Sequence, residues 1–186
     1  MKPLPVTYTI ETPRCHLRIV SLADIPHTFS ASRHEGFCDG MQWDPSETEE
    51  ELIPFYHSTI EAWEKGIAYT FTIEDKTTNE FVGKIATRYK ENSTWDLGFW
   101  THPAQQGKGY MKEAVTAVIA LAFTELAATE VIATHAVWNL ASEKVLQHNG
   151  MSFIKHIPRG FEKKSGWVEL NLLGITHQQW HNSINA

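Results

Sequence analysis

The fold of this chain is decided by residues 103–114, which read Pro-Ala-Gln-Gln-Gly-Lys-Gly-Tyr-Met-Lys-Glu-Ala. They follow a strand-like run from Trp95 to Thr101 and open the most helix-prone segment of the chain, Met111 to Ala128. Gly107 and Gly109 allow the backbone to turn with no Cβ in the way, so successive N–H groups can point at one spot. The positive N-terminal end of the following helix adds to their field. The stretch therefore predicts a phosphate or pyrophosphate site between a strand and a helix.

This loop does not match two other common phosphate-binding motifs. A dinucleotide-binding loop carries a third glycine where Lys112 stands, and a P-loop carries Ser or Thr after its lysine, where Gly109 stands. The side chain of Lys108 is then either a phosphate contact or a solvated loop charge.

The composition is that of a soluble globular protein. The 186 residues are 42% hydrophobic and 20% charged, and no apolar run reaches the ~18 residues of a membrane span. A formal net charge of −6 argues against nucleic acid as the main ligand, because such binding depends on Lys and Arg neutralising phosphates. Cys15 and Cys38 are expected to be reduced, and residues 1–5 lack the apolar run of a signal peptide. We therefore expect one cytoplasmic domain over residues 1–186, monomeric or homodimeric, with no membrane or nucleic-acid partner.

Hydrophobic periodicity and turn residues predict alternating strands and helices. The expected strands are 14–20, 67–74, 81–89, 95–101, 131–137, 151–157 and 167–173, and the expected helices are 22–33, 49–65, 111–128, 139–148 and a turn at 176–181. Short polar turns make the strands between 67 and 101 an antiparallel meander, and the helix after 101 provides a crossover. The apolar run 131–137 is expected to be covered on both faces. We expect an α/β (α+β) fold with a mixed, largely antiparallel sheet of about seven strands and helices on both faces.

Four further segments flank the loop in a fixed order. They are Thr12-Pro13-Arg14-Cys15-His16-Leu17-Arg18, Gly98-Phe99-Trp100, Asn139-Leu140-Ala141-Ser142 with Asn149-Gly150-Met151, and Ile175-Thr176-His177-Gln178-Gln179-Trp180. The ordered set resembles the Gcn5-related N-acetyltransferase (GNAT) superfamily, and most closely its branch of ribosomal-protein alanine/serine N-acetyltransferases. The resemblance covers nearly the whole chain, with Cys15 and Met151 as departures from the pattern. It implies a GNAT fold whose sheet is splayed in the middle and an acyltransferase that uses acetyl-CoA as co-substrate.

By this resemblance, the loop binds the pyrophosphate of acetyl-CoA through main-chain N–H groups. The implied donors are Gln105, Gln106, Gly107, Lys108, Gly109 and Tyr110. The edge of the preceding strand, at Phe99, Trp100 and Thr101, would bind the pantetheine arm. The superfamily loop reads Arg/Gln-x-x-Gly-x-Gly/Ala, and its first position falls on Ala104. We expect this departure to weaken coenzyme binding without abolishing it.

Acetyl transfer needs a deprotonated amine, a polarised carbonyl and a proton for the departing thiolate. An α-amino group, with a pKa of ~7.7–8.0, needs only a modest base, whereas a lysine at ~10.4 needs more. A free main-chain N–H at Trp100 or Thr101 could polarise the carbonyl. Many superfamily members supply the proton from a Tyr at the position held here by Leu146. The ribosomal branch carries a Ser three residues after the Asn, a place that Ser142 occupies.

The resemblance therefore implies Ser142 as the thiolate proton donor and Asn139 as an organiser of coenzyme and water. The alternative for both is structural, because Asn139 is well placed to cap the following helix. The base is left open between Asp96, Glu162 and a water relay. Glu162 has its own alternatives, since Phe161 can hold the aligned position and a carboxylate beside two lysines is commonly a solvated charge.

The acceptor amine is the least determined part of the sequence. Trp43, Phe37 and Trp63 are candidates for the acceptor pocket wall, although aromatic residues more often belong to a core. The preferred acceptor is a protein or peptide N-terminus; the alternatives are a small amine such as an amino acid, polyamine or antibiotic, and a non-catalytic CoA-binding domain. No metal is expected, because His177 and His181 lack the Glu of a His-Glu-x-x-His motif.

Overall fold

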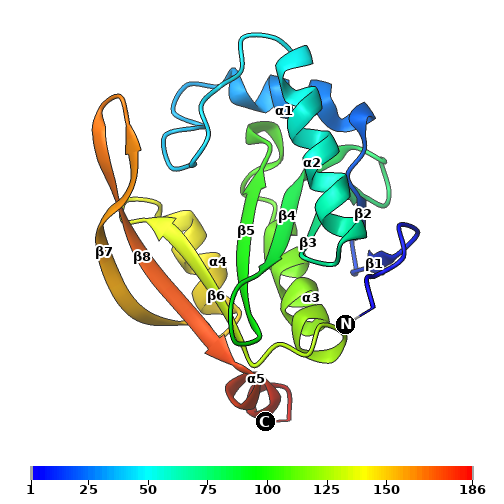
Figure 1. The fold of residues 1–186 in the computed structure, drawn as a ribbon, viewed down its shortest axis with the longest axis vertical. Helices are drawn as coiled ribbons and strands as arrows, with labels where there is room; N and C mark the ends of the chain where they lie inside the picture. Colours follow the sequence, from blue (N-terminus) through cyan, green and yellow to red (C-terminus); the bar gives the residue numbers. More distant parts are fainter. Residues whose placement is uncertain (1, 186) are drawn as a thin grey trace.

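The computed structural model describes residues 2–185, so positions 1 and 186 of the expected domain lie outside the described residues (Figure 1). The strands are β1 (Thr9–Glu11), β2 (Cys15–Ile19), β3 (Ala68–Asp75), β4 (Phe81–Tyr89), β5 (Thr94–Thr101), β6 (Glu130–Ala136), β7 (Ser152–Lys163) and β8 (Gly166–Thr176). The helices are α1 (Ile25–Ser32), α2 (Ile53–Glu64), α3 (Tyr110–Thr124), α4 (Leu140–His148) and α5 (His177–Ile184), with 3-10 turns at Leu22–Asp24, Glu50–Leu52 and Pro103–Gln105.

The strands of this part of the chain form one eight-stranded sheet in the order β1-β2-β3-β4-β5-β6-β8-β7. Every neighbouring pair is antiparallel except β5 and β6, which α3 connects as a crossover. The parallel pairing runs from Thr94 opposite Glu130 to Leu97 opposite Ala133 and stops there. Both strands continue, β5 to Thr101 and β6 to Ala136, so the sheet opens between them. The predicted mixed, splayed sheet is confirmed.

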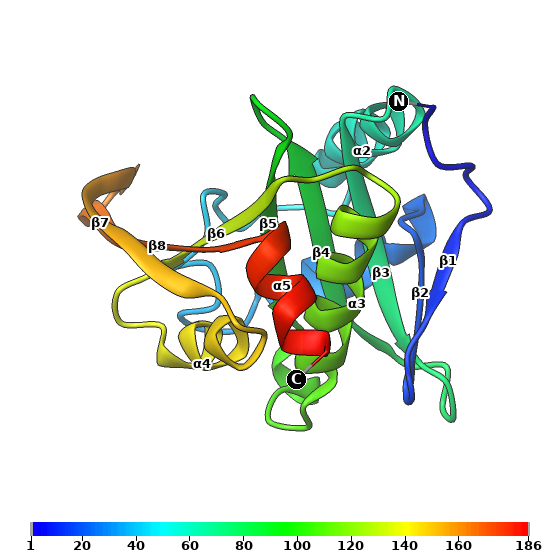
Figure 2. The same cartoon turned by 90° about the horizontal axis from the view of Figure 1, so that it is seen from below.

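Helices cover both faces of the sheet. Figure 2 shows α2 on one face of the sheet and α3 and α4 on the other, and α1 packs together with α2. The main core packs the apolar side of α3 against the inner strands, with Val115, Val118 and Ala122 fully buried. A smaller cluster of Val20, Ile25, Leu52 and Tyr56 holds α1 and α2 together.

Burial along the strands differs from one sequence-based expectation. Residues 131–137 do not form a strand covered on both faces, since Thr134 of β6 is exposed at the opening of the sheet. The strand with an unbroken buried run is β4, from Phe81 to Thr87. The position of β6 beside the gap explains the difference.

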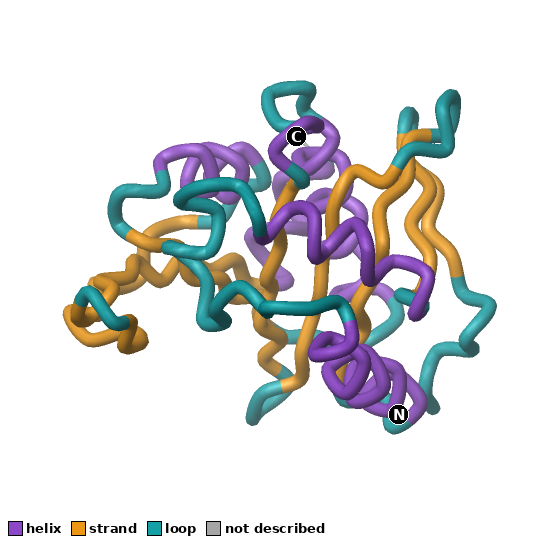
Figure 3. The backbone as a smooth tube through the Cα atoms, turned by 90° about the horizontal axis from the view of Figure 1, so that it is seen from above, coloured by secondary structure: helices purple, strands orange, loops and turns teal. Residues whose placement is uncertain are grey.

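The remaining differences concern short or irregular segments. Strand β1 is three residues long and was not anticipated, which brings the sheet to eight strands instead of about seven. Residues 157–167, expected as a loop, belong to the long β7–β8 hairpin. Most of residues 33–49 form a loop, drawn in teal in Figure 3. No helix among residues 2–185 is both long and apolar enough to cross a membrane.

Candidate active site

The loop before α3 presents a row of free main-chain N–H groups. Gly107 and Gly109 have φ angles of +76° and +82°, a left-handed conformation that glycine adopts without a steric penalty. Within residues 2–185, the N–H groups of Gly107, Lys108, Gly109 and Tyr110 donate to no carbonyl or side chain. A Cβ on Gly107 would meet nothing within 4 Å, so the space before the loop is open. These amides, at the N-terminus of a 15-residue helix, are suited to bind an anion.

Neighbouring strands hold this loop in place. Arg14 donates from Nη1 to the Lys108 carbonyl at 2.9 Å and from Nε to Glu113 at 2.5 Å, and its guanidinium lies 4.8 Å from the Tyr110 ring centroid. Tyr110 donates to Asp75 at 2.5 Å. This bond, with main-chain donors from Thr78 and Thr77, lowers the pKa of Asp75 to about 2, so the carboxylate is ionised at neutral pH. These contacts hold the loop and leave its main-chain N–H groups free.

A cavity of about 580 Å³ runs from this loop to the opening between β5 and β6. Most of the residues that the sequence predicted for the coenzyme line it, namely Phe99, Trp100, Thr101, Gln105, Gln106, Gly107, Gly109, Tyr110, Asn139 and Ser142. Lys108 does not line this cavity: its ammonium group donates to Gln105 at 2.7 Å and its side chain is exposed. The shape suits an elongated ligand with its phosphates at the loop.

Asn139 and Ser142 have a structural role as well as a place in the cavity. The Asn139 side chain accepts a hydrogen bond from the Ser142 main-chain N–H at 3.1 Å, which caps α4. The cap uses only the main chain of Ser142. Among residues 2–185, its hydroxyl makes no hydrogen bond to another protein group, so it is free to donate a proton into the cavity.

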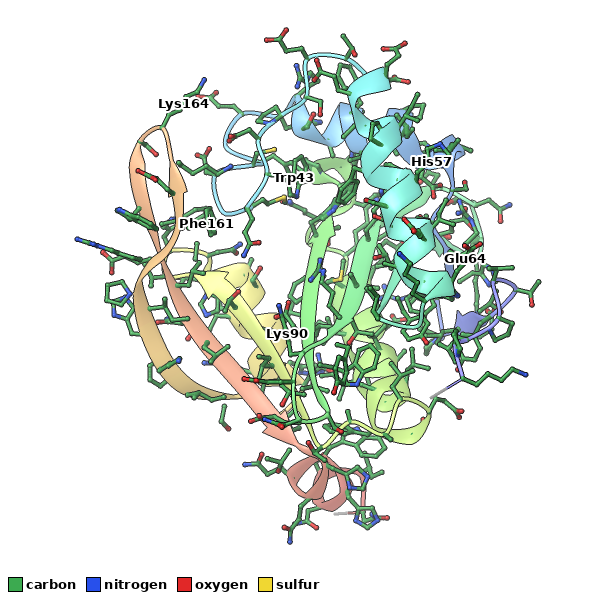
Figure 4. The ribbon with its side chains drawn as sticks, viewed as in Figure 1. Trp43, His57, Glu64, Lys90, Phe161 and Lys164 are labelled. Atoms are coloured by element: carbon green, nitrogen blue, oxygen red, sulfur yellow. The ribbon has the colours of Figure 1, made fainter. Side chains whose placement is uncertain are left out.

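A second cavity of about 630 Å³ opens on the side of α1 and α2. Figure 4 shows Trp43, from the α1–α2 connection, and Phe161, from β7, at the same end of the molecule. Both residues line this cavity. The two cavities share part of their walls, contributed by Gly40, Met41, Leu97, Gly98, Phe99, Trp100, Thr134 and His135. They therefore meet at the opening of the sheet, where a donor and an acceptor can approach from opposite faces.

The aromatic residues that the sequence predicted for the acceptor pocket lie in different parts of the structure. Phe37 lines the coenzyme cavity and packs edge-on against Trp100, with ring centroids 5.4 Å apart, and against Trp43 at 6.1 Å. Trp63 has a different role, because it is fully buried in the core against Tyr69. Its assignment to the pocket wall is wrong.

The two carboxylates proposed from sequence lie in different environments. Asp96 lines the acceptor cavity, with Arg88 Nη1 at 3.4 Å, and burial raises the pKa of its carboxyl group. Glu162 is exposed and lines neither cavity, whereas its neighbour Phe161 lines the acceptor cavity. Since adjacent side chains on a strand point to opposite faces, only one of these two residues can face the site. The structure brings Asp96, not Glu162, to the site.

Two buried polar residues at the site were missed by sequence reasoning. Lys84 is only 5% exposed and lines the acceptor cavity; the available signal was a lysine inside the apolar run Phe81 to Thr87. His135 is 4% exposed and lines both cavities. Its Nδ1 donates to the Ala136 carbonyl at 2.8 Å, and its Nε2 is buried without a partner in the described structure. No group of three His, Cys, Asp or Glu residues suited to a metal occurs among residues 2–185.

The fold and this pair of cavities define a class of protein. Residues 14–152 match the family model of the acetyltransferase (GNAT) domain, and the chain belongs to this family of acetyltransferases. A curated relative, the uncharacterized N-acetyltransferase YnaD of Bacillus subtilis (strain 168), is 31% identical over 98 residues. That match covers 50% of this chain and 55% of YnaD, so the chain spans about half the length of the relative.

Solved structures show the same fold at low sequence identity. RimJ of Mycobacterium smegmatis, in complex with CoA-disulfide, has a TM-score of 0.83 at 18% identity, covering 96% of this chain and 94% of that one. RimL, a ribosomal L7/L12 α-N-protein acetyltransferase in complex with coenzyme A, has a TM-score of 0.82 at 18% identity, covering 91% and 98%. A chimera of the spermidine N-acetyltransferase SpeG of Vibrio cholerae and hSSAT has a TM-score of 0.78 at 18% identity, covering 91% and 99%. Neighbours of this fold thus include acetyltransferases named for protein N-termini and for a polyamine.

Proposed function

We propose that this protein transfers the acetyl group of acetyl-CoA to the N-terminal α-amino group of a protein or peptide. One observation carries the proposal: a cavity that ends at the free loop amides meets a second cavity at the opening of the sheet. Membership of the acetyltransferase family supports acetyl-CoA as the ligand of the first cavity. The amine then enters from the side of α1 and α2.

The residues of this chain have distinct parts in the proposed reaction. The amides of Gly107 to Tyr110 bind the pyrophosphate, and the free edge of β5 at Phe99 to Thr101 aligns the pantetheine arm. The amine nitrogen attacks the thioester carbonyl, the carbon–sulfur bond breaks, and the nitrogen gives up a proton. Ser142 supplies the proton for the departing thiolate, since its hydroxyl is free in the coenzyme cavity.

Asp96 is the carboxylate we assign as base, acting on the amine directly or through water. It lines the acceptor cavity, and the raised pKa of its buried carboxyl group brings its basicity closer to that of an α-amino group. A terminal amine needs only a modest base, which favours it over a lysine side chain as the acceptor. The acceptor cavity of about 630 Å³ is large enough for the first residues of a peptide.

A small amine is the second candidate acceptor, because one structural neighbour is named as a spermidine acetyltransferase. A panel of acceptors separates the two readings. Release of the coenzyme A thiol from acetyl-CoA is measured with peptides that begin with Ala or Ser, with polyamines and with free amino acids. The proposal predicts thiol release with peptides above all. Release only with polyamines would contradict it, and saturable stabilisation by CoA without release on any acceptor would indicate a CoA-binding domain.

A further inference from the structure

The acceptor cavity contains a buried amine that has no acidic partner. Lys84 is only 5% exposed, and within residues 2–185 no carboxylate lies within 4.0 Å of its ammonium group. Its Nζ is hydrogen-bonded to Tyr56 Oη and lies 3.7 Å from the centroid of that ring. The Trp100 ring centroid is 5.9 Å away. Lys84 thus sits in the cavity wall between the sheet and α2.

The buried acid whose charge acts on Lys84 is already engaged elsewhere. Asp24, which is 2% exposed, accepts hydrogen bonds from Arg18 at 2.7 Å, from Thr72 at 2.7 Å and from the Ser21 main chain at 2.8 Å. Tyr56 in turn is hydrogen-bonded to Thr28 at 2.7 Å. The groups that contact the Lys84 amine can orient it, but none of them carries a negative charge.

A buried lysine without an acid beside it is costly, because burial disfavours its charged form. Burial lowers the pKa of Lys84 from 10.5 to about 7, and the charge of Asp24 opposes that shift only in part. An apolar residue of similar length would avoid this cost. An anion that entered the cavity would stabilise the ammonium form of Lys84 and would itself be bound by that ammonium group.

The strand register places Lys84 beside the shared wall of the two cavities. Lys84 is opposite Trp100 and Ala86 is opposite Gly98, and both Trp100 and Gly98 belong to the shared wall of the two cavities. Adjacent strands are about 4.8 Å apart and two residues along a strand span about 6.6 Å, so the Cα atom of Lys84 is about 5 Å from that of Trp100 and about 8 Å from that of Gly98. An extended peptide spans about 7 Å in two residues.

We propose that Lys84 binds a carboxylate of the acceptor, carried by an acidic side chain on its second or third residue. The inference rests on the proposed function and narrows the acceptor class to acidic N-termini. It also disfavours polyamines, because their second cationic group would meet the Lys84 ammonium. A free amino acid offers the same carboxylate chemistry through its α-carboxylate, but in a peptide acceptor that group is an amide, so the first available carboxylate is an acidic side chain.

The experiment compares two peptides that begin Ser-Asp and Ser-Asn and are otherwise identical. Transfer from acetyl-CoA is measured for the wild type and for Lys84→Met, with alanine and alaninamide as the amino-acid arm. Lys90→Met is the matched control, because Lys90 lines the same cavity but is exposed. The wild type should have a KM about 10-fold to 100-fold lower for the Asp peptide, the range typical of a charged hydrogen bond. In Lys84→Met the two peptides should become equal, while Lys90→Met should keep the preference.

Three outcomes would overturn the assignment. One is an equal loss of kcat for both peptides in Lys84→Met, which would give the amine a part in the chemistry instead. Another is an Asp preference that persists in the variant. The third is a Lys84-dependent preference that appears only for alanine over alaninamide. It would show that Lys84 binds the α-carboxylate of a free amino acid and not an acidic side chain. If the wild type transfers acetyl to no acceptor, the proposed function fails, and calorimetric binding of the two peptides still decides the proposal: equal affinities would overturn it.

Discussion

Replacing Lys84 by methionine should stabilise the fold. Each pKa unit corresponds to about 1.36 kcal/mol, so lowering the pKa of Lys84 from 10.5 to about 7 costs roughly 4 kcal/mol at neutral pH. Methionine keeps the length of the side chain and removes that cost, but it gives up the hydrogen bond to Tyr56, worth about 1 kcal/mol. The expected gain in the free energy of unfolding is about 2–3 kcal/mol. For a chain of this size the melting temperature should rise by roughly 5–10 °C.

The sign of the pH dependence gives a second readout of the same effect. Between pH 7 and 10.5 the unfolded chain holds a proton on Lys84 that the folded chain has released. The contribution of Lys84 to the free energy of unfolding of the wild type therefore rises between pH 7 and 10.5 and is constant below pH 7. Lys84→Met should lack this rise.

Urea unfolding at a series of pH values measures both quantities. Lys90→Met is the control for removing a lysine from an exposed site, and it should change stability by less than about 0.5 kcal/mol. A Lys84→Met protein less stable than the wild type at pH 7 would refute the reasoning. Parallel pH curves for the two proteins would refute it equally, because the buried amine would then not titrate near neutrality.

Three substitutions test the site itself. Gly107→Val should abolish acetyl-CoA binding, because the new side chain fills the open space before the loop amides at a φ of +76°; retained tight binding by calorimetry would contradict the loop assignment. Ser142→Ala should lower kcat about 10²-fold or more with little change in acetyl-CoA affinity, since the helix cap uses only its main chain; unchanged turnover would remove its hydroxyl from the mechanism. Asp96→Asn should lower kcat by a similar factor, and Glu162→Gln should stay within about two-fold; the reverse pattern would give the role of base to Glu162.

The sequence determined the coenzyme side of the site well. A two-glycine loop between a strand and a helix has few conformations, and its free amides follow from the left-handed φ of both glycines. The order of elements followed from strong periodicity and clear turns. The gap between β5 and β6 was implied by family resemblance and not by any local pattern.

The acceptor side could not be predicted in the same way, because it is assembled from residues far apart in the chain. Whether Phe161 or Glu162 faces the cavity depends on the register of a hairpin with irregular pairing between Ile157 and Phe161. In the sequence, little distinguishes Lys84 from other lysines in strands, because its burial depends on the packing of α2 against the sheet. His135 is likewise one of ten histidines. Burial created the properties of both residues.

The central claim is that acetyl is transferred to a terminal amine. The direct measurement is tandem mass spectrometry of a Ser-initiated peptide with one internal lysine after incubation with acetyl-CoA and the enzyme. A second peptide, blocked at its α-amine, serves as the control. We expect acetyl on the α-amino group of the first peptide and no product from the second. Acetylation of the internal lysine, or equal product from the blocked peptide, would contradict it.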